Sequence, residues 1–316
     1  MKRAAGVRAV ERYDQLLRTH VLPTLGKYKL QEIHSTDIDK LYLNLEGKIA
    51  PRTVQHVHSV LGSCLGAAVR TRKLAISPME SITKAPAPCE SDHGIALDDD
   101  ELRKLVQGFK GSALFPIVSV AAFTGARRNE ILALRWSDLD PQKKELRIER
   151  AIEETKAHGR RFKGPKKESH KRTITIDDDL LALLLSEREK HLRIVAGVPD
   201  GATVDLSLVK LPEGALMFPK LLRRSPDFLK PRRPKGVTDG FTSRAEQLGF
   251  PGLRFHDLRG THETLLLDRG VPVHVVAARC GHDPAVLLRS YAKRTRKADT
   301  SAAGVIGRIS KGILGN

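Results

Sequence analysis

The chain contains 316 residues, 40% hydrophobic and 29% charged, so it is long enough for one or two folded domains and too apolar to be wholly disordered. Its 55 Lys and Arg residues outnumber 37 Asp and Glu residues, and the net charge of +18 favours a polyanionic partner such as nucleic acid. Aromatic residues make up only 4% of the chain, which argues against stacking on single strands and leaves duplex binding through Lys and Arg open.

Three cysteines, Cys64, Cys89 and Cys280, lie far apart in the sequence. Without a Cys-x-x-Cys pair they predict neither a disulfide framework nor a cysteine zinc site, and they fit a reducing compartment. The longest mostly apolar run, Ala113–Phe123, is interrupted by Pro116 and is far shorter than the roughly 18 to 20 residues of a spanning helix. The basic N-terminus has no apolar segment behind it, so we expect a cytoplasmic protein without a membrane anchor.

Residues 1–83 are predicted to form a small bundle of helices, because their apolar residues recur at helical spacing. Thr36 with Asp39 resembles a capping box at the start of one helix, and Pro51 suits the first turn of another. The segment 84–94 carries two prolines, a glycine and no periodic apolar pattern. It is therefore predicted to be an exposed linker between two domains.

Residues 95–298 are predicted to form the second domain, which is mainly α with a small antiparallel β-sheet. A capping box at Asp98 starts one helix, and a largely buried helix follows at Ala113–Phe123. Alternation of apolar and polar residues around Leu146 and across Arg172–Ile176 predicts two strands of one sheet.

Two stretches of this domain are strongly basic. Lys156–Arg172 holds eight Lys or Arg residues and one acid. Lys220–Lys235 holds seven against Asp227 alone, and its prolines predict a loop. Both stretches suit contact with the phosphates of DNA.

Two short motifs carry side chains that can act on a phosphate. Arg127 lies three residues before Glu130, close enough on a helix for the carboxylate to hold the guanidinium. His256 and Arg259 share one helical face, so a proton carrier and a guanidinium converge there. Taken alone, each pattern is more typical of a solvated helix surface.

A third motif is Cys280-Gly281-His282, nine residues before Tyr291. Gly281 suits a helix C-terminus or tight turn that would fix His282. Tyr291 lies among basic residues, and neighbouring cations favour the phenolate that a tyrosine nucleophile needs, although a tyrosine half-buried at a helix end fits equally. Together the motifs supply what metal-free attack on a phosphodiester requires: two guanidiniums, a proton carrier, a leaving-group acid and a nucleophile.

With these residues in this order, the sequence resembles the tyrosine recombinase, or phage integrase, family. The family's series Arg…Lys…His-x-x-Arg…His…Tyr matches Arg127, Lys166, His256, Arg259, His282 and Tyr291. Lys166 falls in Gly-Pro-Lys-Lys-Glu-Ser-His-Lys-Arg-Thr-Ile, which is similar to the family's hairpin and following strand, and Lys167 is the alternative position for this lysine. Gly260 and Cys280 depart from the family's usual histidine and leucine, and neither departure removes a reacting group.

The resemblance implies a helical, SAM-like core-binding domain at residues 1–83 and a tyrosine recombinase catalytic domain at 95–298. It also favours insertion of the tail, 299–316, whose apolar residues recur at helical spacing, into a neighbouring subunit of a homotetramer on DNA; docking of the tail on its own catalytic domain is the alternative. Many integrases carry a further N-terminal domain that binds arm-type sites. Its absence from this sequence implies either a short recombinase or an incomplete N-terminus.

The activity implied is site-specific DNA recombination through a 3′-phosphotyrosyl intermediate, without metal or other cofactor. Tyr291 is then the nucleophile, Arg127 and Arg259 stabilise the transition state, and Lys166 is the acid for the leaving 5′-oxygen. His256 takes the tyrosine proton or binds the phosphate, His282 binds a non-bridging oxygen, and Glu130 orients Arg127. The implied partners are double-stranded attachment sites and accessory DNA-bending or directionality proteins, in a nucleoid setting.

Two other functions fit the same residues. A type IB topoisomerase shares this chemistry but relaxes DNA instead of exchanging strands, and the integrase-like motifs favour the recombinase. A DNA-binding remnant of a mobile element would occupy a site without cleaving it, and the intact set of reacting side chains weighs against that alternative.

Overall fold

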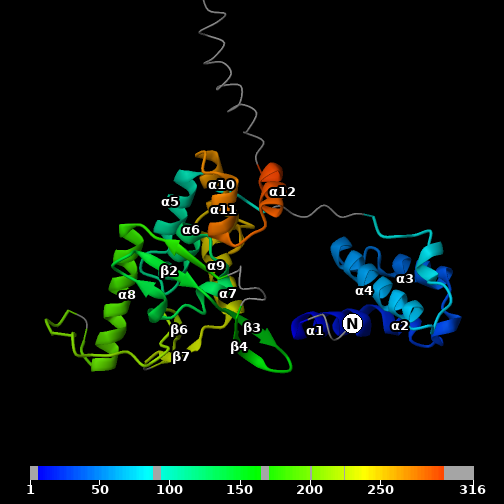
Figure 1. The fold of residues 1–316 in the computed structure, drawn as a ribbon, viewed down its shortest axis with the longest axis horizontal. Helices are drawn as coiled ribbons and strands as arrows, with labels where there is room; N and C mark the ends of the chain where they lie inside the picture. The colour runs from blue at the N-terminus through cyan, green and yellow to red at the C-terminus, as the bar shows by residue number, and fades with distance from the viewer. Residues whose placement is uncertain (1–5, 88–93, 165–170, 200, 224, 295–316) are drawn as a thin grey trace, which may run out of the picture. The chain divides into compact units, whose positions relative to one another are not determined.

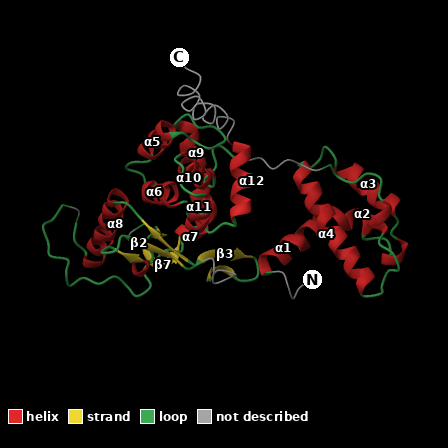
Figure 2. Ribbon diagram, turned by 45° about the horizontal axis from the view of Figure 1, so that its top comes forward, coloured by secondary structure: helices red, strands yellow, loops and turns green. Residues whose placement is uncertain are grey.

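The computed structural model describes residues 6–87, 94–164, 171–199, 201–223 and 225–294 (Figure 1). Two compact units make up the chain, Met1–Asp92 with Glu154–Arg160 and His93–Glu153 with Arg161–Asn316. Helices predominate and the strands form small sheets, as Figure 2 shows, which confirms the expected fold class. In the described part, no helix is both long and apolar enough to cross a membrane.

The first unit is built from helices packed around one apolar core. Its regular elements are α1 (Val7–Leu16), a π-helical turn (Leu17–Val21), α2 (Leu22–Leu25), a 3-10 turn (Leu30–Glu32), α3 (Ser35–Leu45), α4 (Pro51–Arg70) and a second 3-10 turn (Pro78–Ser81). Leu16, Ile38, Leu41, Val57 and Leu65 are buried together between the helices. Pro51 occupies the first turn of α4 as expected, where a missing N–H costs nothing.

The capping box expected at Thr36 and Asp39 is wrong by two residues. Helix α3 starts at Ser35, and the backbone N–H of His34 donates to the Asp37 carboxylate at 3.2 Å. Asp39 lies further along the helix and accepts backbone N–H groups of Thr83 and Lys84 at 3.1 and 2.8 Å. It therefore ties α3 to the segment that leaves the unit.

The second unit carries the remaining elements, apart from the residues of β3 and β4 that fall within Glu154–Arg160, which belong to the first unit. The helices are α5 (Asp99–Gly108), α6 (Phe115–Thr124), α7 (Arg128–Ile131), α8 (Asp178–Ala196), α9 (Pro234–Gln247), α10 (Asp257–Asp268), α11 (Val273–Cys280) and α12 (Pro284–Arg294), with a 3-10 turn at Trp136–Asp138. The strands are β1 (Leu139–Asp140), β2 (Glu145–Ile148), β3 (Ala151–Thr155), β4 (Gly159–Lys163), β5 (Arg172–Thr175), β6 (Pro219–Lys220) and β7 (Asp227–Pro231).

Helix α6 and the sheet β1-β2-β5 form the centre of this unit. Strand β2 pairs antiparallel with β5, and Leu146 lies opposite Ile174, which confirms the two expected strands. Helix α6 is buried almost all round, as expected, and Pro116 lies in its first turn instead of interrupting it. The capping box at Asp98 is also confirmed, since its carboxylate accepts the N–H of Glu101 at 3.0 Å. Helix α6 and the sheet thus contribute to one buried apolar core, from which the chain continues into α7.

The loop expected over Lys220–Lys235 is wrong in part. Strand β7 pairs antiparallel with β6, and helix α9 begins at Pro234. Of the four prolines that predict a loop, Pro219 and Pro231 stand at strand ends and Pro234 in a first helical turn, where a backbone N–H is not needed.

Several expectations fall outside the described residues. Lys166 and Lys167 lie in the undescribed segment 165–170, and the tail 299–316 lies beyond residue 294. Residues 88–93 of the expected linker are likewise undescribed, so the domain boundaries stay predictions.

Candidate active site

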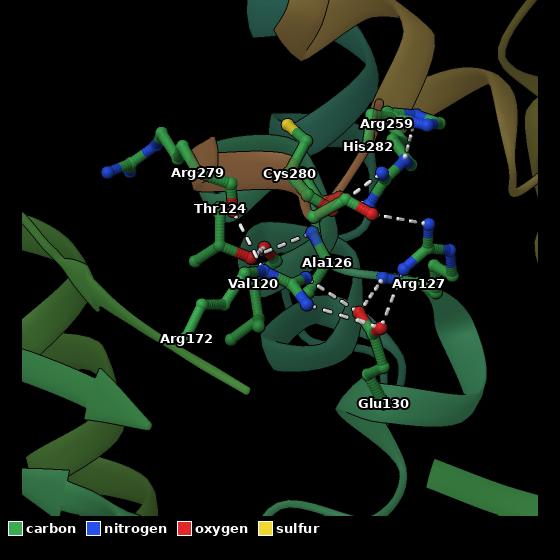
Figure 3. Close-up of polar contacts among 12 residues, drawn as sticks. Val120, Thr124, Ala126, Arg127, Glu130, Arg172, Arg259, Arg279, Cys280 and His282 are labelled. Carbon is green, nitrogen blue, oxygen red and sulfur yellow. Dashed lines mark hydrogen bonds and ion pairs between the residues drawn. The ribbon is translucent and has the colours of Figure 1, made fainter. Parts of the chain in front are cut away.

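Arg127 is fixed by Glu130 at the junction of two helices (Figure 3). Helix α6 ends at Gly125, whose left-handed backbone (φ 64°) turns the chain into α7. Glu130 accepts the backbone N–H of Arg127 at 2.9 Å through one oxygen and its guanidinium at 2.9 Å through the other. The contact expected from the three-residue spacing is present, and it holds both the main chain and the side chain of Arg127.

Arg172 binds the opposite side of the same carboxylate. It lies at the start of β5, is 7% exposed in its side chain, and contacts Glu130 at 2.7 Å. Burial on its own would raise the pKa of Glu130, but hydrogen bonds and positive charge from Arg172, with the contribution of Arg127, lower that pKa to about 2. Glu130 is thus an ionised carboxylate between two guanidiniums.

A second buried carboxylate, Glu263, lies between Arg259 and His282. Its Oε1 is 3.0 Å from Nε of Arg259 and 2.8 Å from Nε2 of His282. Arg259 is only 2% exposed, and its burial lowers the pKa of the guanidinium from the usual value. The site therefore repeats one arrangement, a carboxylate bridging two nitrogen-bearing side chains.

Backbone carbonyls connect the two bridges. Arg259 donates to the carbonyls of Gly125 and Cys280 at 2.7 and 2.6 Å, and Arg127 donates to the carbonyl of Gly281 at 2.9 Å (Figure 3). Gly281 ends α11 in the left-handed conformation, φ 66°, as the sequence predicted. His282 follows directly, so the turn that positions its ring also supplies the acceptors for both arginines.

Gly125 allows this close packing. A Cβ added there would lie 2.8 Å from the ring of His262 and 2.9 Å from Sγ of Cys280. Only a glycine fits both this space and the positive φ. Cys280 is fully buried, and burial raises the pKa of its thiol to about 11, so it packs as a small apolar residue.

His256 directly precedes α10, one turn before Arg259. Its side chain reaches solvent, yet the surrounding atoms desolvate it enough to lower its pKa, and the charge of Arg259 acts in the same direction. A largely neutral imidazole at this position can accept a proton.

Tyr291 lies apart from this network. Its hydroxyl donates to the Asp268 carboxylate at 2.8 Å, and Asp268 is the last residue of α10. Asp268 follows Arg259 by nine residues, about 13 Å of helix. The structure thus brings together Arg127, Glu130, Arg259 and His282, with His256 one turn away, and it holds the tyrosine hydroxyl at the other end of α10.

Sequence reasoning missed Arg172 and Glu263. Arg172 was recognised only as part of a basic strand, because its partner Glu130 is 42 residues away in the chain. Glu263 stands four residues after Arg259, a spacing that predicts an ion pair, but its contact with His282 depends on the tertiary fold. Among the residues that the structure describes, no group of three or more His, Cys, Asp or Glu side chains is arranged to hold a metal ion.

Comparison with known proteins identifies the family of the chain. Residues 96–297, which include the whole arginine network, match the phage integrase family. The chain belongs to that family. Over 80% of its length it is 28% identical to a XerC-like tyrosine recombinase of Caldanaerobacter subterraneus subsp. tengcongensis, and it spans 65% of that protein. Over 88% of its length it is 25% identical to an integrase of Saccharopolyspora erythraea, and it spans 72% of that protein. The chain thus spans just under two thirds of the length of the XerC-like relative.

Solved structures of integrases share the fold of this member of the family. The Tn1549 transposon integrase, solved with transposon right end DNA, superposes with a TM-score of 0.74 at 14% identity, covering 98% of this chain and 96% of that one. A lambda integrase bound to a core site gives a TM-score of 0.66 at 16% identity, covering 93% and 92%. A lambda integrase tetramer on a Holliday junction gives 0.64 at 16% identity, covering 94% and 75%.

Proposed function

We propose that this phage integrase family member is a site-specific DNA recombinase that cleaves and rejoins duplex DNA through a 3′-phosphotyrosyl intermediate. The observation that carries the proposal is the network around Arg127 and Arg259. Glu130 pairs with the first arginine and Glu263 with the second, and the two guanidiniums donate to the carbonyls of two adjacent residues, Gly281 and Cys280. Two fixed guanidiniums suit the negative charge that grows on a phosphodiester under attack. The net charge of +18 suits the DNA backbone.

The chemistry follows from the roles proposed for the individual residues. Tyr291 Oη attacks the scissile phosphorus, and the P–O5′ bond breaks as the new P–O bond forms. The phenol proton passes to His256, and Lys166, or Lys167 in the alternative register, gives a proton to the departing 5′-oxygen. Arg127, Arg259 and His282 bind the non-bridging oxygens, where each such contact is worth about 3 kcal/mol.

Rejoining is the same reaction in reverse on a new partner strand. A free 5′-hydroxyl attacks the phosphotyrosyl phosphorus, gives up its proton, and releases Tyr291, which is protonated again. The number of phosphodiester bonds is conserved, so no energy source is consumed. We expect double-stranded attachment sites as substrate and a homotetramer as the assembly, with accessory bending proteins in a nucleoid setting; the tetramer follows the lambda integrase example.

One assay tests the proposal against its alternatives. The purified chain is incubated with supercoiled and linear DNA carrying the attachment core, taken from direct repeats that flank the encoding locus. Covalent protein–DNA adducts together with recombinant joints support a recombinase. Relaxation without joints indicates a topoisomerase, and a gel shift without adducts indicates a protein that only binds.

A further inference from the structure

Arg172 is a buried guanidinium that the proposed chemistry does not itself use. Its side chain is 7% exposed, and it binds both oxygens of Glu130, with Nη2 2.7 Å from one and Nη1 3.3 Å from the other. Its remaining nitrogen, Nε, donates to the carbonyl of Arg279 at 2.8 Å. All three nitrogens of Arg172 thus have partners within the protein, so its role has to be sought in what it holds.

The C-terminal turn of α11 receives three arginines on the successive carbonyls of residues 279–281. Arg172 donates to the first carbonyl at 2.8 Å, Arg259 to the second at 2.6 Å and Arg127 to the third at 2.9 Å. The last carbonyls of a helix lack partners within the helix and form the negative end of its dipole, which favours cations there. This turn therefore gathers guanidiniums from β5, from α10 and from the residue before α7.

Arg127 is held from two sides by groups that Arg172 also contacts. Nη1 of Arg127 donates to Glu130 and Nη2 donates to the Gly281 carbonyl, each at 2.9 Å. Arg172 binds the same carboxylate, as Figure 3 shows. Its guanidinium also packs against Gly281, where an added Cβ would lie 3.0 Å from Nη1. Arg172 therefore links the two supports of Arg127 to each other.

Arg172 also balances the charge of Glu130. A carboxylate paired with Arg127 alone would cancel the positive charge that a phosphate has to meet. Glu130 is ionised, so the two guanidiniums around it leave one positive charge in excess. The side chain of Arg127 is 39% exposed, against 7% for Arg172, and the excess charge is therefore offered at Arg127, which solvent reaches.

We propose that Arg172 is a positioning residue, which fixes Arg127 through Glu130 and the α11 turn and keeps the charge of Arg127 available to the scissile phosphate. The inference rests on the proposed function, because it concerns the phosphate under attack. Without Arg172, Glu130 neutralises Arg127 and the two supports lose their link. Cleavage then slows although every group proposed to touch the DNA remains.

The first test is spectroscopic and needs no activity. In the chain labelled with ¹⁵N-arginine, the Nη signals of Arg127 are assigned by their loss in an Arg127→Lys variant. Rotation about the Nε–Cζ bond exchanges Nη1 with Nη2 and has to break both hydrogen bonds, so we expect two separate signals at low temperature. A single averaged signal in the wild-type chain overturns the proposal, whatever the folding of any Arg172 variant. Arg172→Gln should speed the exchange by about fivefold or more, the effect of losing one typical hydrogen bond, and an unchanged rate contradicts the link.

The second test compares two DNA substrates in single-turnover cleavage of a nicked duplex that carries the attachment core. In one, the scissile phosphate is ordinary; in the other, a methyl group replaces a non-bridging oxygen and removes the negative charge. Arg172→Gln should slow cleavage of the ordinary phosphate by about 10- to 100-fold, the range for groups that hold a metal ligand from behind. The defect should shrink to about threefold or less on the uncharged substrate, because positive charge matters less there.

Arg172→Lys restores the charge without the planar fork, so it should cleave the ordinary phosphate at least about threefold faster than Arg172→Gln. Arg150→Gln is the matched control, because Arg150 pairs with another buried carboxylate, Asp138, in the same unit. We expect that control to slow both substrates by the same factor.

Three outcomes contradict the positioning role: an equal slowing of both substrates by Arg172→Gln, no slowing of either, or Arg172→Lys no faster than Arg172→Gln. Failure of the wild-type chain to form any adduct counts against the proposed function alone, since the spectroscopic test stands without it.

Discussion

The hydroxyl of Tyr291 donates a hydrogen bond to the carboxylate of Asp268 at 2.8 Å. This contact lies at the C-terminal end of α10, whereas Arg259 lies in its first turn. The hydroxyl of the proposed nucleophile is thus held by a residue that lies nine positions, or about 13 Å of helix, beyond Arg259 in α10. Tyr291 has to leave Asp268 before it can react.

Removal of this carboxylate should therefore speed the first cleavage step. A hydrogen bond is worth about 1 kcal/mol net, so Asp268→Ala should raise the single-turnover cleavage rate by up to about fivefold where release of Tyr291 limits it. Asp100→Ala, which removes a 90% exposed carboxylate on α5, is the control and should leave the rate unchanged. A slower Asp268→Ala enzyme would show that Asp268 assists the attack.

Tyr291→Phe should abolish covalent adducts and leave DNA affinity within about threefold, because one hydroxyl is lost from an interface dominated by phosphate contacts. Adducts are measured on denaturing gels and affinity by gel shift on the same core duplex. Adducts that persist in this variant would assign the nucleophile to another residue.

Lys166→Ala should slow cleavage of ordinary DNA by about 100-fold or more, the usual contribution of a general acid. A substrate with sulfur in place of the bridging 5′-oxygen has a leaving group that needs no proton, and it should restore the rate. Lys167→Ala serves as the paired control and should show no such rescue. If the two variants exchange behaviour, the proposed acid moves by one residue.

Local patterns in the sequence were sufficient for the parts of the site that are local in the chain. The three-residue spacing of Arg127 and Glu130 and the glycine before His282 both describe contacts within one turn of backbone. Arg172 reaches the site only because β5 pairs with β2 and passes beside α7 and α11. The spacing of the residues around Arg172 in the sequence does not indicate its contact with Glu130.

The position of Tyr291 was also beyond local reasoning. The sequence placed the tyrosine in the proposed series of reacting groups, and the structure places its hydroxyl on Asp268, 23 residues earlier. The order of residues along a chain identifies the chemistry available, whereas the packing of α12 decides where the hydroxyl lies. Strand β7 illustrates the same limit: the prolines in and around it predict a loop, but β7 pairs with β6 and Pro231 lies at its end.

The last prediction concerns the charge of Glu130 and its effect on stability. The pKa of Glu130 is lowered from 4.5 to about 2, so the ionised form is favoured in the folded state. A shift of this size corresponds to about 3 kcal/mol of stability, present above the unfolded-state pKa and lost as the pH falls through the folded-state value. Glu130→Gln should therefore lower the free energy of unfolding most at pH 7, and its difference from wild type should shrink between about pH 4.5 and pH 2.

Urea unfolding of both proteins across that pH range measures the effect. Glu246→Gln, an exposed carboxylate on α9, is the control and should differ from wild type by less than about 0.5 kcal/mol at every pH. Arg172→Ala should reproduce much of the loss at pH 7, because it removes the guanidinium that contacts Glu130 at 2.7 Å. A Glu130→Gln deficit that stays constant as the pH falls would mean that the side chain acts through its shape and packing, with no contribution from its charge.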